Sequence, residues 1–316
     1  TTTLTIYKGG EYLYNQVVTM GGLDVTESIE DLGISLPLAE RLKCMYGVAT
    51  AEKVKMDRRY VLTTMQGDKV AIGSIQLANT ISAKLDEIAK ANGVSVLGTG
   101  INPGFVLDLL ILALTGTCEE VDYIKAARVN DLSPFGKAVM IEQGVGVTKD
   151  EFLRGVEDGS IAGHVGFPES INMITDGIGW NLEKVEETRE PIMSNVYRKS
   201  EYAEVEAGNV AGCRQCGYGY VNGKVKIEME HPQQILPHLE GQSTGDYVSI
   251  KGIPNIDLQI TPEIPGGIGT IAMCVNSIPH IINAIPGLKT MLDIPVPRAI
   301  MGDMRGLVNL KETAQA

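Results

Sequence analysis

The feature that most constrains the fold is the stretch from Gly93 to Gly116. A short apolar run, Val94 to Leu97, leads into a glycine-containing loop, and a strongly apolar segment follows it. This order of strand, loop and helix is typical of α/β proteins, which commonly hold a ligand in a glycine-rich loop at the carboxyl end of a strand. Because Pro103 fixes its own φ and moves Asn102 out of the α region, we expect the helix to begin near Gly104.

The glycines of this loop leave two interpretations open. Gly98, Gly100 and Gly104 are not spaced as in the dinucleotide-binding fingerprint, and no acidic residue follows at the expected distance on a second strand. The loop therefore either holds a ligand or only makes a tight connection between a strand and a helix.

Unusual strings follow one another along the chain. They are Leu97-Gly-Thr-Gly-Ile-Asn-Pro-Gly-Phe105, Asn130-Asp-Leu-Ser-Pro-Phe-Gly136, Gly163-His-Val-Gly-Phe-Pro-Glu-Ser170, Glu230-His-Pro-Gln-Gln234, Pro262-Glu-Ile-Pro-Gly-Gly-Ile-Gly-Thr270 and Pro295-Val-Pro-Arg-Ala-Ile-Met-Gly-Asp303. Together they resemble the carboxyl-terminal part of the 2,4-diaminopentanoate dehydrogenase family, from about Lys84 to Gly306. That family is related in fold to dihydrodipicolinate reductase.

Members of that family begin with a nucleotide-binding Rossmann half, and no complete Rossmann half is visible in this chain. Residues 1 to about 87 instead resemble part of the bacterial actin-like cell-division ATPases, through Thr1-Thr-Thr-Leu-Thr-Ile-Tyr-Lys-Gly-Gly10, Gly21-Gly22 and Leu38-Ala-Glu-Arg-Leu-Lys43. The expected organisation is therefore a partial actin-like α/β segment over residues 1–88, followed by an α+β substrate and oligomerisation domain over residues 89–316.

Composition and charge exclude several classes of protein. A chain of 316 residues is long enough for two domains that each bury a core. Its 44% hydrophobic and 21% charged residues are typical of a globular protein and not of a disordered one. The net charge of −12 argues against a nucleic-acid partner and against binding to an anionic membrane. A cationic small molecule would be better tolerated.

The cysteines and the apolar runs favour a cytoplasmic protein. Five cysteines, an odd number, fit reduced thiols, and the lone pair Cys213 and Cys216 has no second pair to complete a zinc site. With the histidines far apart as well, we expect no metal. The longest apolar run, Phe105 to Leu114, is interrupted by Asp108 and is too short to cross a bilayer. No signal peptide is visible, and the missing initiator methionine suggests a fragment, a processed chain or a fusion.

Local patterns predict the regular elements. The first part is expected to hold a hairpin of Thr1–Tyr7 and Tyr12–Met20 and helices over Val25–Leu32, Pro37–Tyr46 and from Ser74 towards Gly93. A strand over Val121–Val129, a loop over Asn130–Gly146, a helix over Lys149–Glu157 capped by Thr148, and a helix over Pro168–Ile178 come next.

Strands dominate from Val185 onward. They are expected over Ile192–Val196, Tyr202–Glu206, Ala211–Val221, Val225–Glu230, Tyr247–Lys251 and Ile256–Ile260, and a helix over Gly267–Ala284 follows them. Asn222 and Gly223 predict a tight hairpin turn. Many strands flanked by helices predict an α+β domain with a largely antiparallel sheet.

The resemblance implies the chemistry. A dehydrogenase of this family removes a hydride from the amine-bearing carbon of a diamino acid, with NAD or NADP as the cofactor, and water attacks the resulting iminium. The cofactor carries the hydride chemistry, while the protein positions the substrate and moves protons. A substrate with two ammonium groups and one carboxylate requires acidic or carbonyl acceptors and a cationic donor.

Asp131 and Arg128 are candidates for two of these roles. Asp131 ends a predicted strand, where it would meet a substrate ammonium or act as a general base; the alternative is an Asx turn in which it bonds its own backbone. Arg128 would bind the substrate carboxylate with both arms of its guanidinium, unless it is a surface arginine on the strand.

Three further side chains complete the list. His164 lies in a loop before a predicted helix and is a candidate for proton transfer near neutral pH, although structural histidines are common. Asn276 and His280 share a helix face beside Pro279, and they either contact the substrate or pair at a domain interface. For Glu169, in the first turn of the helix after His164, complementing the helix macrodipole is the favoured interpretation over binding substrate.

The cofactor-facing residues implied by the resemblance are Gly98, Thr99, Gly100, Asn102 and Gly104, whose backbone would reach the nicotinamide carboxamide. We expect a homo-oligomer that acts on a small diamino acid. The alternatives are a non-catalytic binding or assembly module, or a chimeric chain that lacks its cofactor half and is inactive.

Overall fold

The computed structural model describes the chain except residues 1, 9–10, 19–21, 47–58, 64–68 and 310–316. The chain forms two compact units. The smaller comprises Thr1–Leu97, Pro279–Asp293 and Arg305–Ala316, and the larger comprises Gly98–Ile278 and Ile294–Met304. The boundary predicted at residue 88 rested on the two family resemblances. The smaller unit also contains two later segments, Pro279–Asp293 and Arg305–Ala316.

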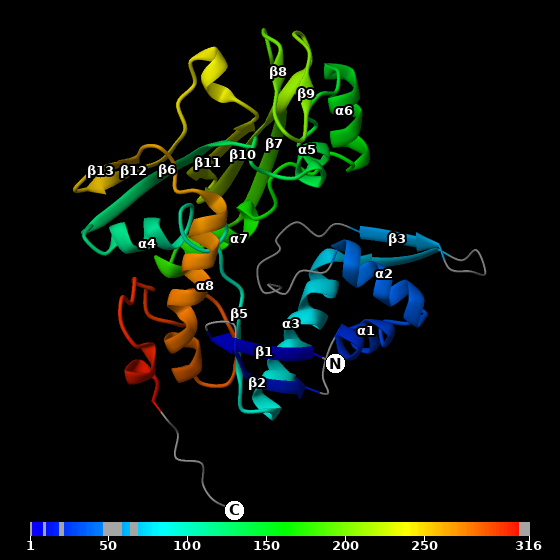
Figure 1. The fold of residues 1–316 in the computed structure, drawn as a ribbon, viewed down its shortest axis with the longest axis vertical. Coiled ribbons are helices and arrows are strands. Elements are labelled where there is room, and N and C mark those ends of the chain that lie inside the picture. The colour runs from blue at the N-terminus through cyan, green and yellow to red at the C-terminus, as the bar shows by residue number, and fades with distance from the viewer. Residues whose placement is uncertain (1, 9–10, 19–21, 47–58, 64–68, 310–316) are drawn as a thin grey trace, which may run out of the picture. The chain divides into compact units, whose positions relative to one another are not determined.

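The smaller unit combines two hairpins with helices (Figure 1). Its elements are β1 (Thr2–Lys8), β2 (Glu11–Val18), α1 (Gly22–Glu30), α2 (Leu36–Tyr46), β3 (Arg59–Thr63), β4 (Lys69–Gly73), α3 (Ser74–Ala91), β5 (Ser95–Leu97) and β14 (Gly287–Lys289). Ile29, Leu42, Ile72 and Leu77 form its buried core. The amino-terminal hairpin and the three helices that were predicted are confirmed.

The loop after β5 differs from the prediction in where its helix begins. Helix α4 covers Leu109–Thr115, so a start near Gly104 was wrong. The reason is Asp108, whose carboxylate accepts hydrogen bonds from the N–H groups of Leu109 and Gly104, both at 2.7 Å. This side chain caps the helix, while the φ of +128° at Gly104 is outside the helical range and the Asn102–Pro103 bond is cis.

The larger unit is built on a six-stranded sheet in the order β13-β12-β6-β11-β10-β7 (Figure 1). The strands are β6 (Glu120–Asp131), β7 (Lys184–Met193), β10 (Val210–Val221), β11 (Lys224–Gln234), β12 (Gly245–Ile253) and β13 (Ile256–Ile260). Only β6 and β11 pair in parallel, and the other neighbours are antiparallel. The predicted α+β class with a largely antiparallel sheet is therefore confirmed.

Helices and short elements complete this unit. They are α5 (Lys137–Glu142), α6 (Lys149–Asp158), α7 (Phe167–Gly177), β8 (Arg198–Lys199), β9 (Glu204–Val205), the 3₁₀ helix η2 (Pro237–Glu240) and α8 (Gly266–Asn283), whose last residues belong to the smaller unit. The 3₁₀ helix η3 (Met304–Leu307) begins in the larger unit and lies mostly in the smaller. Thr148 caps α6 as predicted, and Asn222 and Gly223 both have positive φ in their turn. The predicted loop from Asn130 contains α5, and the strand predicted over Ile192–Val196 is the end of the longer β7, so these two boundaries were wrong.

One face of the sheet is covered by α7 and α4. Phe167 and Ile171 of α7 pack on two glycines of β10. A Cβ added at Gly217 would lie 2.8 Å from Phe167, and one added at Gly219 would lie 2.7 Å from Ile171. The missing side chains allow the helix to approach the strand closely. The opposite face carries polar pairs such as Lys125 with Glu228, which is typical of an antiparallel sheet with one solvated side.

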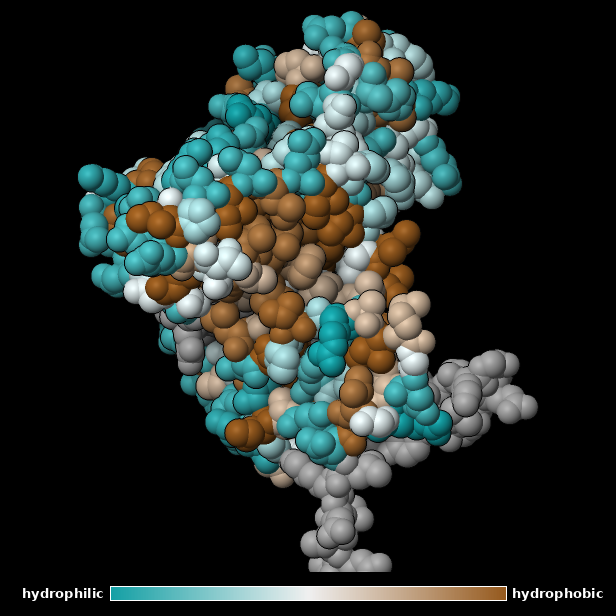
Figure 2. Space-filling model, turned by 90° about the vertical axis from the view of Figure 1, so that its left-hand side faces the viewer, coloured by the Kyte–Doolittle hydropathy of each residue, from teal (hydrophilic) through white to brown (hydrophobic). Residues whose placement is uncertain are grey.

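Apolar side chains also gather at the surface (Figure 2). In the larger unit, α8 exposes Ile268, Ile271, Val275 and Ile278, whose relative accessible surfaces are 69%, 66%, 42% and 43%. Their helical spacing places them on one face of α8. Exposed apolar faces of this kind mark interaction sites in many proteins.

Candidate active site

The covered face of the sheet changes from apolar to polar along its strands. On β6, Ile124 and Ala126 belong to the hydrophobic core, and Arg128 follows on the same face. On β11, Met229 lies in the core and His231 follows it. Because alternate residues of a strand face the same side, each strand carries its polar residue at the edge of the core.

Strand pairing aligns these polar residues into a row across the sheet. Asp246 of β12 pairs with Arg128 of β6, and Gln215 of β10 pairs with both His231 of β11 and Arg189 of β7. His231 Nδ1 lies 2.6 Å from the Arg128 carbonyl oxygen and joins the two sets. We call these five residues the polar row.

A buried ion pair anchors one end of the polar row. Arg128 Nη1 lies 2.6 Å from Asp246 Oδ1, and the two residues are only 2% and 1% exposed. Arg128 Nη2 donates to the Ile264 carbonyl at 2.6 Å, and Asp246 Oδ2 accepts from the Ile264 N–H at 2.9 Å. The pair thus holds both main-chain groups of the residue that leads into α8. Binding of a substrate carboxylate by Arg128 stays a prediction.

His164 lies over the middle of the polar row. Gln215 holds its main chain from both sides, accepting from the His164 N–H at 2.8 Å and donating to its carbonyl at 2.9 Å. The His164 ring centroid lies 4.9 Å from that of His231 and 5.0 Å from that of Phe167. Gly163 has a φ of +67°, and a Cβ there would collide with Gln215 Oε1, so glycine is required before His164.

The electrostatic surroundings keep both histidines neutral. Burial lowers the pKa of His164 to about 4, and the positive charges of Arg128 and Arg189 act in the same direction. The pKa of His231 is also lowered, first by burial and then by His164, although its contact with the Arg128 carbonyl opposes this. A neutral imidazole presents one donor and one acceptor nitrogen.

The loop from Gly98 to Gly104 meets His164. Asn102 Nδ2 lies 3.5 Å from His164 Nε2, and an added Cβ at Gly166 would lie 2.7 Å from Pro103 and 3.3 Å from the same His164 nitrogen. Among the described residues, Asn102 Oδ1 and Thr99 Oγ1 are buried without a hydrogen-bond partner. The predicted cofactor-facing loop and the predicted proton carrier are therefore neighbours.

Two carboxyl groups lie beside this junction. Glu187 of β7 accepts from Gln215 Nε2 at 2.8 Å, and its other oxygen lies 3.7 Å from Arg189 Nη2. Glu169 lies in the first turn of α7, and its Oε2 is buried with no partner among the described residues. Burial raises the pKa of Glu169, and Glu187 raises it further.

Sequence reasoning missed several of these residues. Glu169 stands in one of the strings that carry the family resemblance, so a signal for it existed. Glu187 lies on a strand with several charged residues, where no local pattern distinguishes it. Gln215 and Arg189 become functional candidates only through strand pairing.

Asp131 lies outside the polar row. Its Oδ1 accepts from Ser133 N–H at 2.8 Å, from Ser133 Oγ at 2.5 Å and from Leu236 N–H at 3.0 Å. The bonds from Ser133 are the local turn of the alternative interpretation, whereas the bond from Leu236 joins Asp131 to a distant part of the chain. A catalytic role of Asp131 stays a prediction.

Asn276 and His280 lie on α8, but Asn276 belongs to the larger unit and His280 to the smaller. His280 Nε2 is buried without a partner among the described residues. No hydrogen bond in the described part of the chain joins Asn276 to the polar row. Their role as substrate contacts stays a prediction.

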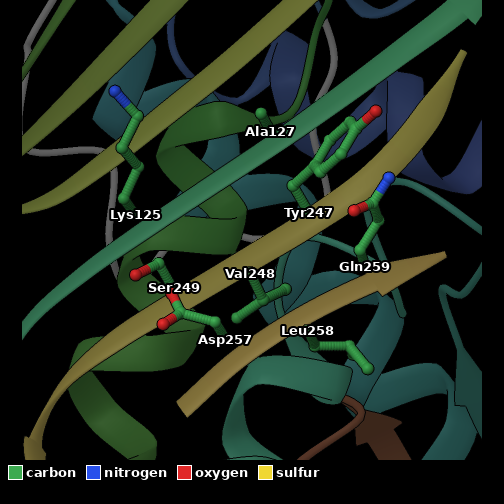
Figure 3. Close-up of a pocket in the computed structure, with 8 residues that line it drawn as sticks. All are labelled: Lys125, Ala127, Tyr247, Val248, Ser249, Asp257, Leu258 and Gln259. Atoms are coloured by element: carbon green, nitrogen blue, oxygen red, sulfur yellow. The ribbon is translucent and has the colours of Figure 1, made fainter. Parts of the chain in front are cut away.

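A surface depression on the other face of the sheet is a poorer candidate (Figure 3). It is lined by Lys125, Ala127, Tyr247, Val248, Ser249, Asp257, Leu258 and Gln259. Its only cation, Lys125, lies 2.5 Å from Glu228. In the described ranges, no cluster of histidine, cysteine and acidic side chains could hold a metal ion. No described helix is long and apolar enough to cross a membrane.

Comparison with known proteins gives consistent similarities. The family described as 2,4-diaminopentanoate dehydrogenase C-terminal domain matches residues 105–310. A protein of Acetoanaerobium sticklandii named 2,4-diaminopentanoate dehydrogenase is 61% identical over 230 residues, which are 72% of this chain and 65% of that protein. An amine dehydrogenase of Streptomyces virginiae is 28% identical over 226 residues, 66% of this chain and 62% of the relative.

The solved structure of an amine dehydrogenase from Mycobacterium smegmatis is similar in fold, with a TM-score of 0.62 and 24% identity, over 70% of this chain and 64% of that one. The chain thus spans less than two thirds of the length of each of these relatives. None of these similarities supports the actin-like resemblance of residues 1–88.

Proposed function

The chain belongs to the 2,4-diaminopentanoate dehydrogenase family through its C-terminal domain, and from this premise we propose that it takes part in the NAD(P)-dependent oxidative deamination of 2,4-diaminopentanoate to 2-amino-4-oxopentanoate. The activity of the whole enzyme is part of the proposal, because the chain spans 65% of the Acetoanaerobium relative. Because the chain belongs to a family of dehydrogenases, the alternative of a non-catalytic assembly module is not favoured.

The observation that carries the proposal is the meeting of His164, the loop from Gly98 to Gly104 and the polar row. His164 is neutral, and its ring therefore accepts a hydrogen bond from the water that must attack the substrate iminium. Gln215 fixes the main chain of His164 from both sides, so the ring is held in one place. Asp131 is proposed as a second proton acceptor.

The residues of the loop fit one end of the cofactor. Thr99 Oγ1 and Asn102 Oδ1 are buried acceptors without partners among the described residues, and a nicotinamide carboxamide carries N–H donors that match them. When bound, NAD or NADP would supply the hydride acceptor. Gly98, Gly100 and Gly104 allow the backbone to approach this group closely.

The remaining assignments follow the family. We propose that Arg128, Asn276 and His280 contribute to substrate binding and that residues 89–316 form the substrate domain. A homo-oligomer is also proposed, supported by the exposed apolar face of α8. Location in the cytoplasm is proposed because Cys118, Cys213, Cys216 and Cys274 are free thiols.

The test is spectrophotometric. The purified chain is mixed with 2,4-diaminopentanoate and NAD or NADP, and the absorbance of the reduced nicotinamide is followed. An increase that is lost in His164→Gln and kept in His238→Gln, an exposed histidine, supports the proposal. Absence of both turnover and substrate binding in the unaltered chain would overturn it.

A further inference from the structure

Glu169 is a half-buried residue whose carboxyl group has no counter-charge among the described residues. Its Oε2 is inaccessible and has no hydrogen-bond partner among the described residues, and none of the ion pairs found in that part of the chain includes Glu169. A buried carboxylate is costly unless it is paired or protonated. Burial raises the pKa of Glu169 in the free chain, and a positive group bound beside it would instead stabilise the carboxylate.

The charged group that acts on Glu169 is another carboxylate. Glu187 lies close enough to raise the pKa of Glu169. Arg189 of the polar row lies 3.7 Å from Glu187, and its Nε donates to the Ala162 carbonyl at 2.8 Å. Glu169 therefore has a negative neighbour and takes part in none of the ion pairs found among the described residues.

A second observation connects Glu169 to the proposed site. Glu187, which acts on Glu169 electrostatically, accepts from Gln215 Nε2 at 2.8 Å, and the same Gln215 nitrogen donates to the His164 carbonyl at 2.9 Å. Asn102 of the loop proposed to face the cofactor lies beside His164. A ligand group that satisfies Glu169 Oε2 must bring an N–H donor, and a positive charge would strengthen the bond.

The geometry points to Glu169 as the residue that binds an ammonium group of the diamino acid and makes the site select a substrate with two amino groups. This inference rests on the proposed function, because the substrate class comes from it. The expected macrodipole role is insufficient, since an acidic side chain that only complements a helix terminus remains solvent-exposed, as Asp150 does in the first turn of α6. Ammonium and carboxylate also form a charge-assisted hydrogen bond, the strong kind.

The experiment measures ligand selectivity by titration calorimetry on the full 316-residue chain. The ligands are 2,4-diaminopentanoate, 2-aminopentanoate and 4-aminopentanoate, which differ only in their amino groups. The variants are Glu169→Gln, Glu169→Asp and, as the matched first-turn control, Asp150→Asn. The midpoint of thermal unfolding is recorded for each variant to establish that it is folded.

The expected result is a loss of selectivity in Glu169→Gln. Its affinity for the diamino acid should fall on the order of 10- to 100-fold, while that for the monoamino acid lacking the bound ammonium should hardly change. The monoamino ligand whose affinity is unaffected identifies which ammonium is bound. Glu169→Asp should keep part of the selectivity, and Asp150→Asn all of it.

Two results would overturn the inference and are distinguishable. If the unaltered chain prefers the diamino acid and Glu169→Gln keeps this preference, or loses all three ligands equally, the role of Glu169 is wrong while the proposed function stands. If the unaltered chain binds none of the ligands, the proposed function fails and the inference fails with it.

Discussion

His164 shows how the surroundings of a single residue define its chemistry. A free imidazole is half charged near pH 6.5, whereas burial and two nearby arginines keep this one neutral down to about pH 4. The neutral ring is useful for a site that binds a cation, because a positive imidazolium would repel an ammonium group. Arg128 is fixed beside His164 because its guanidinium is bound by Asp246 and by the Ile264 carbonyl.

The depressed pKa of His164 predicts a pH dependence of stability. Because the unfolded chain binds this proton more tightly than the folded one, the stabilisation is complete above pH 6.5 and is lost as the pH falls towards 4. The shift corresponds to a loss of about 3 kcal/mol in the free energy of unfolding. Urea unfolding of the unaltered chain and of His164→Gln across this range measures it.

In that comparison, His164→Gln should flatten the acid limb, and His231 should keep its own share of the slope. The exposed His238→Gln is the control and should follow the unaltered chain. An acid limb in His164→Gln that is as steep as in the unaltered chain would show that His164 is not buried in its neutral form.

At the scale of elements, short-range signals were predictable and long-range ones were not. The Thr148 cap and the turn at Asn222 and Gly223 depend on neighbours in sequence, and both were predicted. The polar row depends on strand register, which pairs Arg128 with Asp246 across more than a hundred residues. His164 and Asn102 could be singled out by their strings, but their contact is a product of packing between α7 and the loop.

The misplaced start of α4 has the same origin. Pro103 is a local signal for a helix start, yet Asp108 overrides it through a tertiary arrangement: its carboxylate accepts from Gly104, from Leu109 and from the hydroxyl of Ser170 on α7. Gly104 and Leu109 lie close to Asp108 in the sequence, so a local pattern can indicate them. Ser170 is 62 residues away, so no local pattern can. One buried side chain therefore connects the loop, α4 and α7.

This connection predicts a graded loss of stability. Asp108→Ala leaves two buried N–H groups and one hydroxyl without their acceptor and should lower the free energy of unfolding by about 2–4 kcal/mol. Ser170→Ala removes only one of the three bonds and should cost about 1 kcal/mol. Urea unfolding of both variants measures the difference, and equal losses would show that Asp108 does not connect the three elements.

At the scale of the whole molecule, the two units have separate main cores. The smaller unit is built around Leu77 and its neighbours, whereas the larger is built around the sheet and Ile171 of α7. The residues proposed to act on the substrate from the polar row and the loop all belong to the larger unit. Its sheet keeps them in register, while the smaller unit contributes none of them.

The two cores predict that each unit can be loosened by itself. Leu77 and Ile171 are both fully buried, and replacing either with alanine should cost about 2–5 kcal/mol in its own unit. Hydrogen exchange followed by mass spectrometry then reports where protection is lost. With Leu77→Ala, amides of α1 and α3 should exchange faster while those of β6 and β10 keep their protection, and with Ile171→Ala the pattern should reverse. Faster exchange in β6 and β10 of Leu77→Ala would instead mean that the units unfold together, and the polar row and its neighbouring loop would then depend on both cores for their stability.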